Sequence, residues 1–122
     1  MQDLVGIVRT EKEMTRALDL IAQLKEQAAK VAVMGNREYN PGWHTSLDLH
    51  NLLTIADAVT RSGLSRKESR GAHFREDFPD RDEVLGKVNT ILCKSPDGEM
   101  QMTQEPIPDM PDELKQIIEE IH

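Results

Sequence analysis

The stretch that decides the fold is residues 45–71, TSLDLHNLLTIADAVTRSGLSRKESRG. Its apolar side chains recur at steps of three and four residues between Leu49 and Leu64, which is the spacing of one face of a helix. Thr45 is a suitable N-cap, because its hydroxyl can accept a hydrogen bond from the first turn. Three cations and then Gly71 follow, as is typical of a helix C-terminus. The stretch therefore predicts an amphipathic helix from Thr45 to about Gly71.

A first helix is predicted upstream of this one. Thr10 followed by Glu13 is a capping-box pattern, and apolar residues recur at helical spacing over residues 14–28. Gly35 can end that helix, because it tolerates the left-handed conformation. Residues 35–44, GNREYNPGWH, are then a loop with an Asn-Pro-Gly turn. Two helices of about 20 to 25 residues joined by a short loop favour an antiparallel pair.

The pattern changes after residue 84. Residues 88–92 alternate as in a strand, a Pro-Asp-Gly turn follows at 96–98, and Met100 and Met102 alternate again, which predicts a β-hairpin. Residues 105–111, EPIPDMP, are expected to be extended, because each proline disfavours the helical conformation of the residue before it. The last apolar residues have helical spacing; they are Leu114, Ile117, Ile118 and Ile121.

We therefore predict a mainly α fold, a three-helix bundle of the spectrin-repeat kind with a small C-terminal β-hairpin and a terminal helix. Residues 1–83 form the bundle, and residues 84–122 form the hairpin and helical tail, packed on the same domain. The 122 residues suffice for one hydrophobic core. Each long helix can bury only one stripe against the other, so residues 1–8 or the terminal helix must supply a third layer.

The composition excludes several classes of function. The chain has 15 basic and 22 acidic residues, and a net charge of −7 disfavours nucleic acid as a partner. Its longest apolar run, residues 31–34, is far below the roughly 18 residues that span a bilayer, so we expect no direct membrane insertion. The single cysteine, Cys93, cannot form an intramolecular disulfide, which fits a reducing compartment and a cytoplasmic location.

Residues 65–82, SRKESRGAHFREDFPDRD, differ from the rest, because ten of the eighteen are charged, five of each sign. Two interpretations stay open. The segment is either a helix end followed by a solvated loop, or a surface that binds a partner. In the second interpretation Arg70, His73 and Arg75 project from an irregular segment, and the guanidinium groups can bind carboxylates or phosphates in bidentate fashion.

No metal site is predicted. The spacing of His44, His50 and His73 matches no pair of metal ligands on a helix. The acidic residues of segment 77–82 lack the glycine and the terminal glutamate of a calcium loop.

The sequence resembles a known family over most of its length. Residues 66–82, RKESRGAHFREDFPDRD, closely resemble the ESRGAH-x-R-x-DFPDRD signature near the C-terminus of the flavoprotein subunit of succinate dehydrogenase and fumarate reductase. Residues 1–14, MQDLVGIVRTEKEM, resemble the start of that family's C-terminal domain, and residues 47–68 resemble its leucine-rich helix before the signature.

The resemblance implies that the chain is the C-terminal domain of such an FAD-dependent enzyme, a three-helix bundle packed on the flavin domain. In that family FAD is held by an N-terminal Rossmann-type domain with a GxGxxG turn, and the dicarboxylate is held by His, Arg and Thr residues elsewhere. The GxGxxG motif does not occur here. No catalytic or cofactor-binding residue is therefore assigned to this chain. FAD would belong to the full-length subunit, and the isolated fragment is expected to be inactive.

The residues that match the signature are candidates for a docking role; they are Arg70, His73, Arg75 and Asp77. The resemblance implies a flavin-binding domain in cis and an iron–sulfur subunit as partners. It further implies a peripheral location on the cytoplasmic face of the inner membrane, through partner subunits.

Two alternatives remain. The first is the C-terminal domain of L-aspartate oxidase, which has a similar ESRG-x-H element. The ending GAHFREDFPDRD of residues 71–82 fits the dehydrogenase better, because the oxidase usually has a bulkier residue before its histidine and lacks the final Arg-Asp. The second is a free-standing helical interaction module, which requires Met1 to be a natural start.

Overall fold

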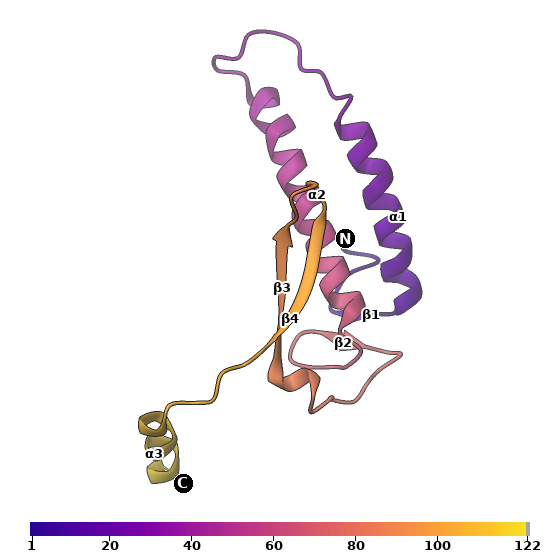
Figure 1. The fold of residues 1–122 in the computed structure, drawn as a ribbon. Coiled ribbons are helices and arrows are strands. Elements are labelled where there is room, and N and C mark those ends of the chain that lie inside the picture. The colour runs from indigo at the N-terminus through magenta and orange to yellow at the C-terminus, as the bar shows by residue number, and fades with distance from the viewer. Residues whose placement is uncertain (122) are drawn as a thin grey trace.

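The computed structural model describes residues 1–121. Helix α1 (Glu11–Ala28) and helix α2 (Pro41–Ser65) lie side by side and run in opposite directions (Figure 1). Two short strands, β1 (Val8–Arg9) and β2 (Phe74–Arg75), pair in parallel near the start of α1 and the end of α2. The predicted antiparallel helix pair is confirmed.

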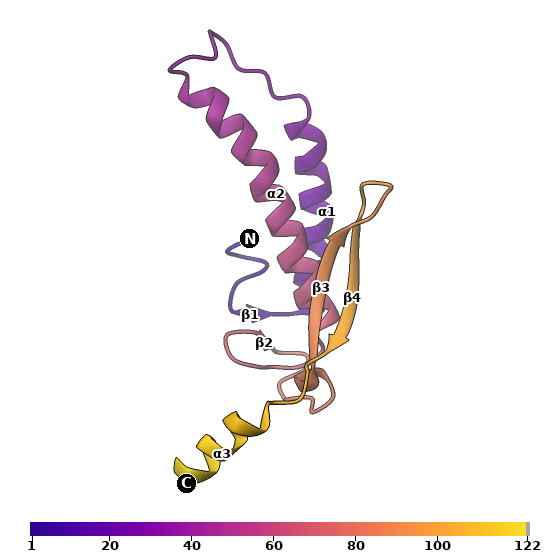
Figure 2. The ribbon, with the colours of Figure 1, turned by 60° about the vertical axis from the view of Figure 1, so that its left-hand side comes forward.

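A hairpin and a third helix complete the chain. A single 3₁₀ turn, η1 (Leu85–Lys87), leads into β3 (Val88–Lys94), which pairs antiparallel with β4 (Met100–Pro106). The hairpin lies along α2, and helix α3 (Asp112–Ile121) lies beyond it, away from α1 and α2 in both views (Figures 1 and 2). The predicted class, mainly α with a small hairpin and a terminal helix, is confirmed.

The first helix begins where the sequence predicts and ends earlier. The hydroxyl of Thr10 accepts a hydrogen bond from the amide of Glu13 at 3.3 Å and donates to the Glu13 carboxylate at 2.8 Å. The helix ends at Ala28, seven residues before Gly35. The β-branched residues Val31 and Val33 follow this end, and such residues lose side-chain freedom in a helix.

The second helix is displaced at both ends from the prediction. It begins at Pro41, because the side chain of Asn40 accepts from the amide of Gly42 at 3.1 Å and proline is well suited to the first helical position. It ends at Ser65, and Arg66 is already extended. Gly71 is left-handed with φ of 59°, as predicted, but it serves a tight turn in the loop after the helix.

The core lies between α1 and α2. Met14 is fully buried and packs with Val5 and Ala17. A side chain at Gly63 would place its Cβ 3.2 Å from the sulfur of Met14, so glycine allows the two helices to approach closely here. The other buried residues of the two helices are Ile21, Ala28, Leu53, Asp57 and Thr60.

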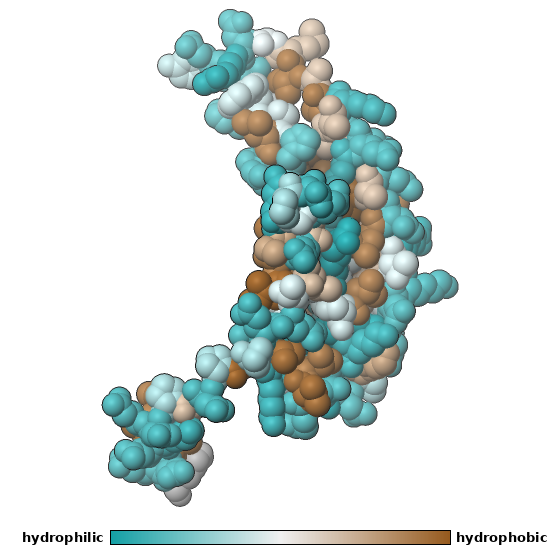
Figure 3. All heavy atoms as spheres, in the orientation of Figure 1, coloured by the Kyte–Doolittle hydropathy of each residue, from teal (hydrophilic) through white to brown (hydrophobic). Residues whose placement is uncertain are grey.

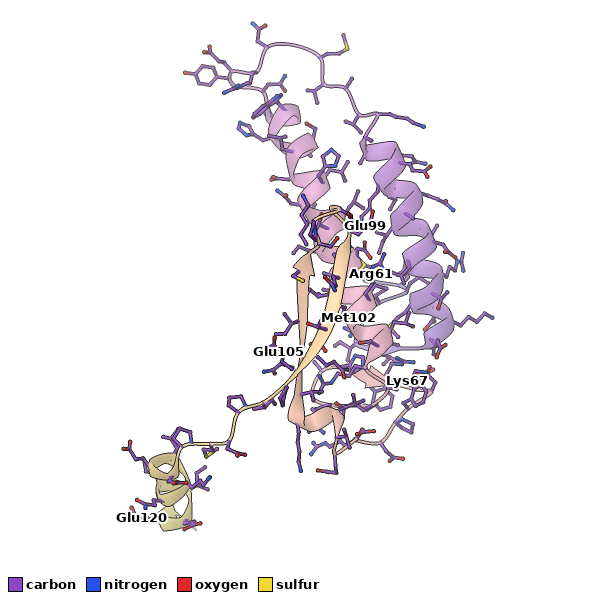
Figure 4. The ribbon with its side chains drawn as sticks, in the orientation of Figure 1. Arg61, Lys67, Glu99, Met102, Glu105 and Glu120 are labelled. Atoms are coloured by element: carbon purple, nitrogen blue, oxygen red, sulfur yellow. The ribbon has the colours of Figure 1, made fainter. Side chains whose placement is uncertain are left out.

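A buried carboxylate also links the two long helices. Asp57 of α2 forms ion pairs with Lys25 of α1 and, at 2.5 Å, with Arg61. Burial of Asp57 opposes its ionisation, but the hydrogen bonds from the two cations outweigh burial and lower its pKa. Glu99, at the tip of the hairpin, borders the same pocket as this cluster, and Figure 4 shows it near Arg61.

The hairpin has the predicted turn. Residues Val88 to Lys94 pair with Pro106 to Met100 in register, and Gly98 adopts a left-handed φ of 88° in the turn. Alternate residues of β3 are half-buried, whereas β4 beyond Met100 is exposed. In the described part of the chain, no helix is both long enough and apolar enough to cross a bilayer.

Candidate functional site

The signature loop, residues 66–82, lies between the end of α2 and the start of the hairpin. Pairing of β1 with β2 anchors it to the N-terminal segment, because the amides of Phe74 and Glu76 donate to the carbonyls of Ile7 and Arg9 at 3.2 and 3.0 Å. Two stretches that the sequence analysis singled out separately are therefore in direct contact. They are the N-terminal VGIVR segment and the charged signature.

Arg75 is the centre of the first of two networks in this loop, and its side chain is fully buried. It donates to both carboxylate oxygens of Asp77 at 2.7 Å and to the carbonyls of Gly63 and Leu64 at 3.0 and 3.2 Å. Its guanidinium also lies 5.0 Å from the ring centre of Phe78. Arg75 thus supplies hydrogen bonds and positive charge to the C-terminus of α2, where free carbonyls and the helix dipole favour a cation.

Asp77 extends this network to the start of α1. Its carboxylate accepts a hydrogen bond from the amide of Glu11, the first residue of that helix, at 3.0 Å. The hydrogen bonds from Arg75 are the main reason that the pKa of Asp77 lies well below its usual range. One ion pair therefore joins the beginning of α1 to the end of α2.

Glu68 is the centre of the second network, and the sequence analysis did not identify it. Its side chain is fully buried and accepts from Arg66 at 2.7 Å, from Arg70 at 3.1 Å and from the amide of Asp82 at 2.9 Å. Burial opposes ionisation, but these hydrogen bonds lower its pKa from 4.5 to about 2. The available signal was its place between two arginines, each two residues away in the sequence.

Arg70 connects this network to the base of the hairpin. It donates to the carbonyl of Asp82 at 3.0 Å, and its side chain is 36% exposed. A Cβ at Gly86 would lie 2.5 Å from a guanidinium nitrogen of Arg70, so only glycine fits there without displacing the arginine. Arg66 acts beside it and donates to the carbonyl of Leu85 at 2.5 Å.

His73 lies at the junction of β1, α2 and the loop. Its Nδ1 is 2.8 Å from Nη1 of Arg9, and its Nε2 is 3.1 Å from the carbonyl oxygen of Arg66. Because arginine can only donate and a carbonyl can only accept, these contacts require a neutral ring with its hydrogen on Nε2. Burial, together with the nearby charges of Arg9, Arg75 and Arg66, lowers the pKa of His73.

An exposed apolar groove borders the loop. Ile55, Val59 and Leu92 line it between α2 and β3, and Arg9 and Arg66 stand at its polar end with His73. Ile55 is 63% exposed, and the neighbouring Leu52 is 66% exposed. In Figure 3 apolar side chains lie among polar ones on the surface of the body and of the C-terminal arm. The groove could hold an apolar segment of a partner.

Three of the four candidate residues thus belong to the two networks, His73 has partners of its own, and the four do not converge on one pocket. Arg75 and Asp77 bind each other, Arg70 binds Glu68, and His73 binds Arg9. Within residues 1–121 every buried polar side-chain atom has a hydrogen-bond partner. No three potential metal-ligating side chains cluster in that range. This arrangement fixes the shape of the loop and presents the groove beside it.

Comparisons with known proteins agree on one family. Residues 1–117 match the family described as fumarate reductase flavoprotein C-term. The fumarate reductase flavoprotein subunit of Mycobacterium tuberculosis is 33% identical over 108 residues, which are 88% of this chain and 18% of the relative. The L-aspartate oxidase of Yersinia pestis is 40% identical over 86 residues, which are 68% of this chain and 15% of the oxidase.

A solved structure is similar over nearly the whole chain. It is described as Mycobacterium smegmatis Sdh1 in complex with UQ1, and it is 36% identical with a TM-score of 0.88. The match covers 98% of this chain and 20% of that chain. This chain therefore spans about a fifth of the length of the proteins it is similar to.

Proposed function

We propose that this chain has a docking role within a longer FAD-dependent subunit. The chain belongs to the C-terminal family of fumarate reductase and succinate dehydrogenase flavoproteins. The subunit would interconvert succinate and fumarate and pass electrons to an iron–sulfur partner. Its partner subunits would hold it on the cytoplasmic face of the inner membrane. This chain would support the catalytic site without contributing a catalytic residue.

The observation that carries the docking role is the groove beside the signature loop. Its apolar lining is exposed, as Ile55 at 63% shows, and at its polar end His73 is hydrogen-bonded to Arg9 and to the carbonyl of Arg66. An exposed apolar surface with a charged border is typical of an interface between domains. In this proposal Arg75 and Asp77 act as positioning residues that keep the loop in place.

The residues of this chain do not fit FAD. The sequence has no GxGxxG turn that would bring a backbone close to the pyrophosphate. The N-terminus of α2 offers no phosphate site either, because Asn40 already caps it and Pro41 has no amide hydrogen. FAD would be bound by the remainder of the full-length subunit.

The docking role is tested in the full-length subunit with Ile55→Glu. A buried charge at an apolar interface is unfavourable, so we expect less bound flavin per subunit and slower succinate oxidation. Gln23→Glu, on the exposed side of α1, adds the same charge and should leave both quantities unchanged. Normal flavin content in Ile55→Glu would contradict docking through this groove.

L-aspartate oxidase is the second candidate, because its similarity to this chain reaches 40% identity. The two activities are separated by assaying the full-length subunit with succinate and an electron acceptor, and with L-aspartate and oxygen. We expect oxidation of succinate. Turnover of L-aspartate alone would assign the chain to the oxidase.

A further inference from the structure

The C-terminal arm, residues 107–121, carries an apolar face that the rest of this chain leaves open. Leu114, Ile117 and Ile118 of α3 are 50%, 52% and 46% exposed. Ile107 and Met110, in the segment leading to α3, are 48% and 45% exposed. Both ribbon views show the arm reaching away from the helix pair, and Figure 4 places Glu120 at its far end (Figures 1, 2 and 4).

A helix of this length needs a surface to pack against. It has 10 residues, and isolated helices shorter than about 12 to 15 residues are marginal in water. Lys115 forms an ion pair with Asp112 at 2.9 Å, and both side chains are largely exposed, so it adds little stability. The apolar face is the feature of α3 that can supply the missing stability.

The match to the Mycobacterium smegmatis chain bears on what covers this face. It includes 98% of the present chain, so it extends through α3, at a TM-score of 0.88. That chain is about five times as long as the present one. A helix that packs on nothing, at the end of an extended, proline-containing segment, would have no fixed position relative to the body. The additional length of such a subunit provides a surface that can hold it.

The charged residues of α3 indicate the charge of the surface that would hold it. With 100° per residue, Glu113 and Glu120 lie together along one edge of the apolar face, and Lys115 lies along the other. A second copy of α3 packed antiparallel would place the glutamate edges against each other, which is unfavourable. An anionic lipid surface would repel the two glutamates, and interfacial helices are rich in Lys and Arg instead. The geometry fits an apolar protein groove with cations along the Glu113 side.

We propose that α3 docks in cis, in such a groove on the flavin-carrying remainder of the full-length subunit. The inference rests on the proposed function, because it requires that remainder to exist. It goes further in assigning a second contact, separate from the α2–β3 groove. The α2–β3 groove and the arm would then attach this domain to the flavin domain at two points.

Hydrogen exchange of the full-length subunit, purified without its partner subunits, tests the proposal. We expect the amides of residues 114–121 to exchange about 100-fold more slowly than in an unstructured peptide, because docking stabilises the helix. Ile118→Asp, on the apolar face, should abolish this protection. Gln116→Asp, on the opposite face, introduces the same charge and should preserve it.

The other outcomes contradict the proposal. Bound flavin with unprotected α3 amides would overturn docking in cis while the proposed function stands. Protection that appears only after the iron–sulfur subunit is added would assign the arm to a separate partner. A full-length protein without flavin would overturn the proposed function, and this inference with it.

Discussion

Arg75 and Asp77 form a bidentate ion pair, with both hydrogen bonds 2.7 Å long and the arginine fully buried. The pair joins three parts of the chain, because Arg75 also donates to the last turn of α2 and Asp77 accepts from the amide of Glu11. It is the structural centre of the signature loop. In the sequence Arg75 suggested a surface that binds a partner, but in the structure it binds Asp77 and α2 of its own chain.

Replacing Arg75 should destabilise the fold strongly. Arg75→Met keeps the bulk of the side chain but removes both side-chain hydrogen bonds to the carboxylate of Asp77 and the one to the carbonyl of Gly63. We expect a loss of about 3–5 kcal/mol in the free energy of unfolding, measured with urea. Arg81→Met, at an exposed position of the same loop, should change it by less than about 0.5 kcal/mol. A loss below about 1 kcal/mol for Arg75→Met would contradict the assigned role.

The contribution of Glu68 to the free energy of unfolding should decrease at low pH. Its pKa is lowered from 4.5 to about 2, so the ionised carboxylate stabilises the folded state fully above pH 4.5. This contribution should disappear as the pH falls towards about 2. Urea unfolding of the protein and of Glu68→Gln across this range should show a difference that shrinks with acidification. A difference independent of pH would contradict the prediction.

His73 should make the fold less stable on mild acidification. Its pKa is lowered from 6.5, so the unfolded chain binds a proton more readily than the folded chain. Stability is then undiminished above pH 6.5 and decreases as the pH falls below it. His73→Gln should remove this part of the pH dependence, whereas His44→Gln, at an exposed position, should retain it. Identical pH profiles for the protein and His73→Gln would be the contrary result.

The loss of stability caused by a substitution at Gly86 should depend on Arg70. Gly86→Ala would displace the guanidinium, since the new Cβ would lie 2.5 Å from it, and we expect a loss of about 1–3 kcal/mol. In the Arg70→Ala background the same substitution should cost much less, because nothing remains to be displaced. The four unfolding free energies form a double-mutant cycle. Additive effects would show that the two positions do not interact.

Local signals predicted much of this fold. The Thr10–Glu13 pair marked the start of α1, the Pro-Asp-Gly turn marked the hairpin, and apolar spacing predicted α3. Each signal depends on neighbours within a few residues, and that information is contained in a single sequence. The start of α2 was also marked locally, but Pro41 was interpreted as part of a turn when it is the first helical residue.

Long-range contacts explain what the sequence did not predict. Gly71 and the three cations before it looked like a helix end, yet α2 ends at Ser65 and Arg75 supplies the cation from ten residues further on. Glu68 accepts a hydrogen bond from the amide of Asp82, 14 residues away, and His73 is bonded to Arg9, 64 residues away. Sequence spacing contains no information on such partners. The charged loop could therefore be located in advance, but its internal pairing could not.

In our proposal this chain is the C-terminal part of a larger flavoprotein. Intact mass and flavin content of the native protein, isolated from its source cells by an antibody against this sequence, test it most directly. We predict a polypeptide about five times the 13.8 kDa of this chain, with bound FAD. A native species of 13.8 kDa without flavin would contradict the account.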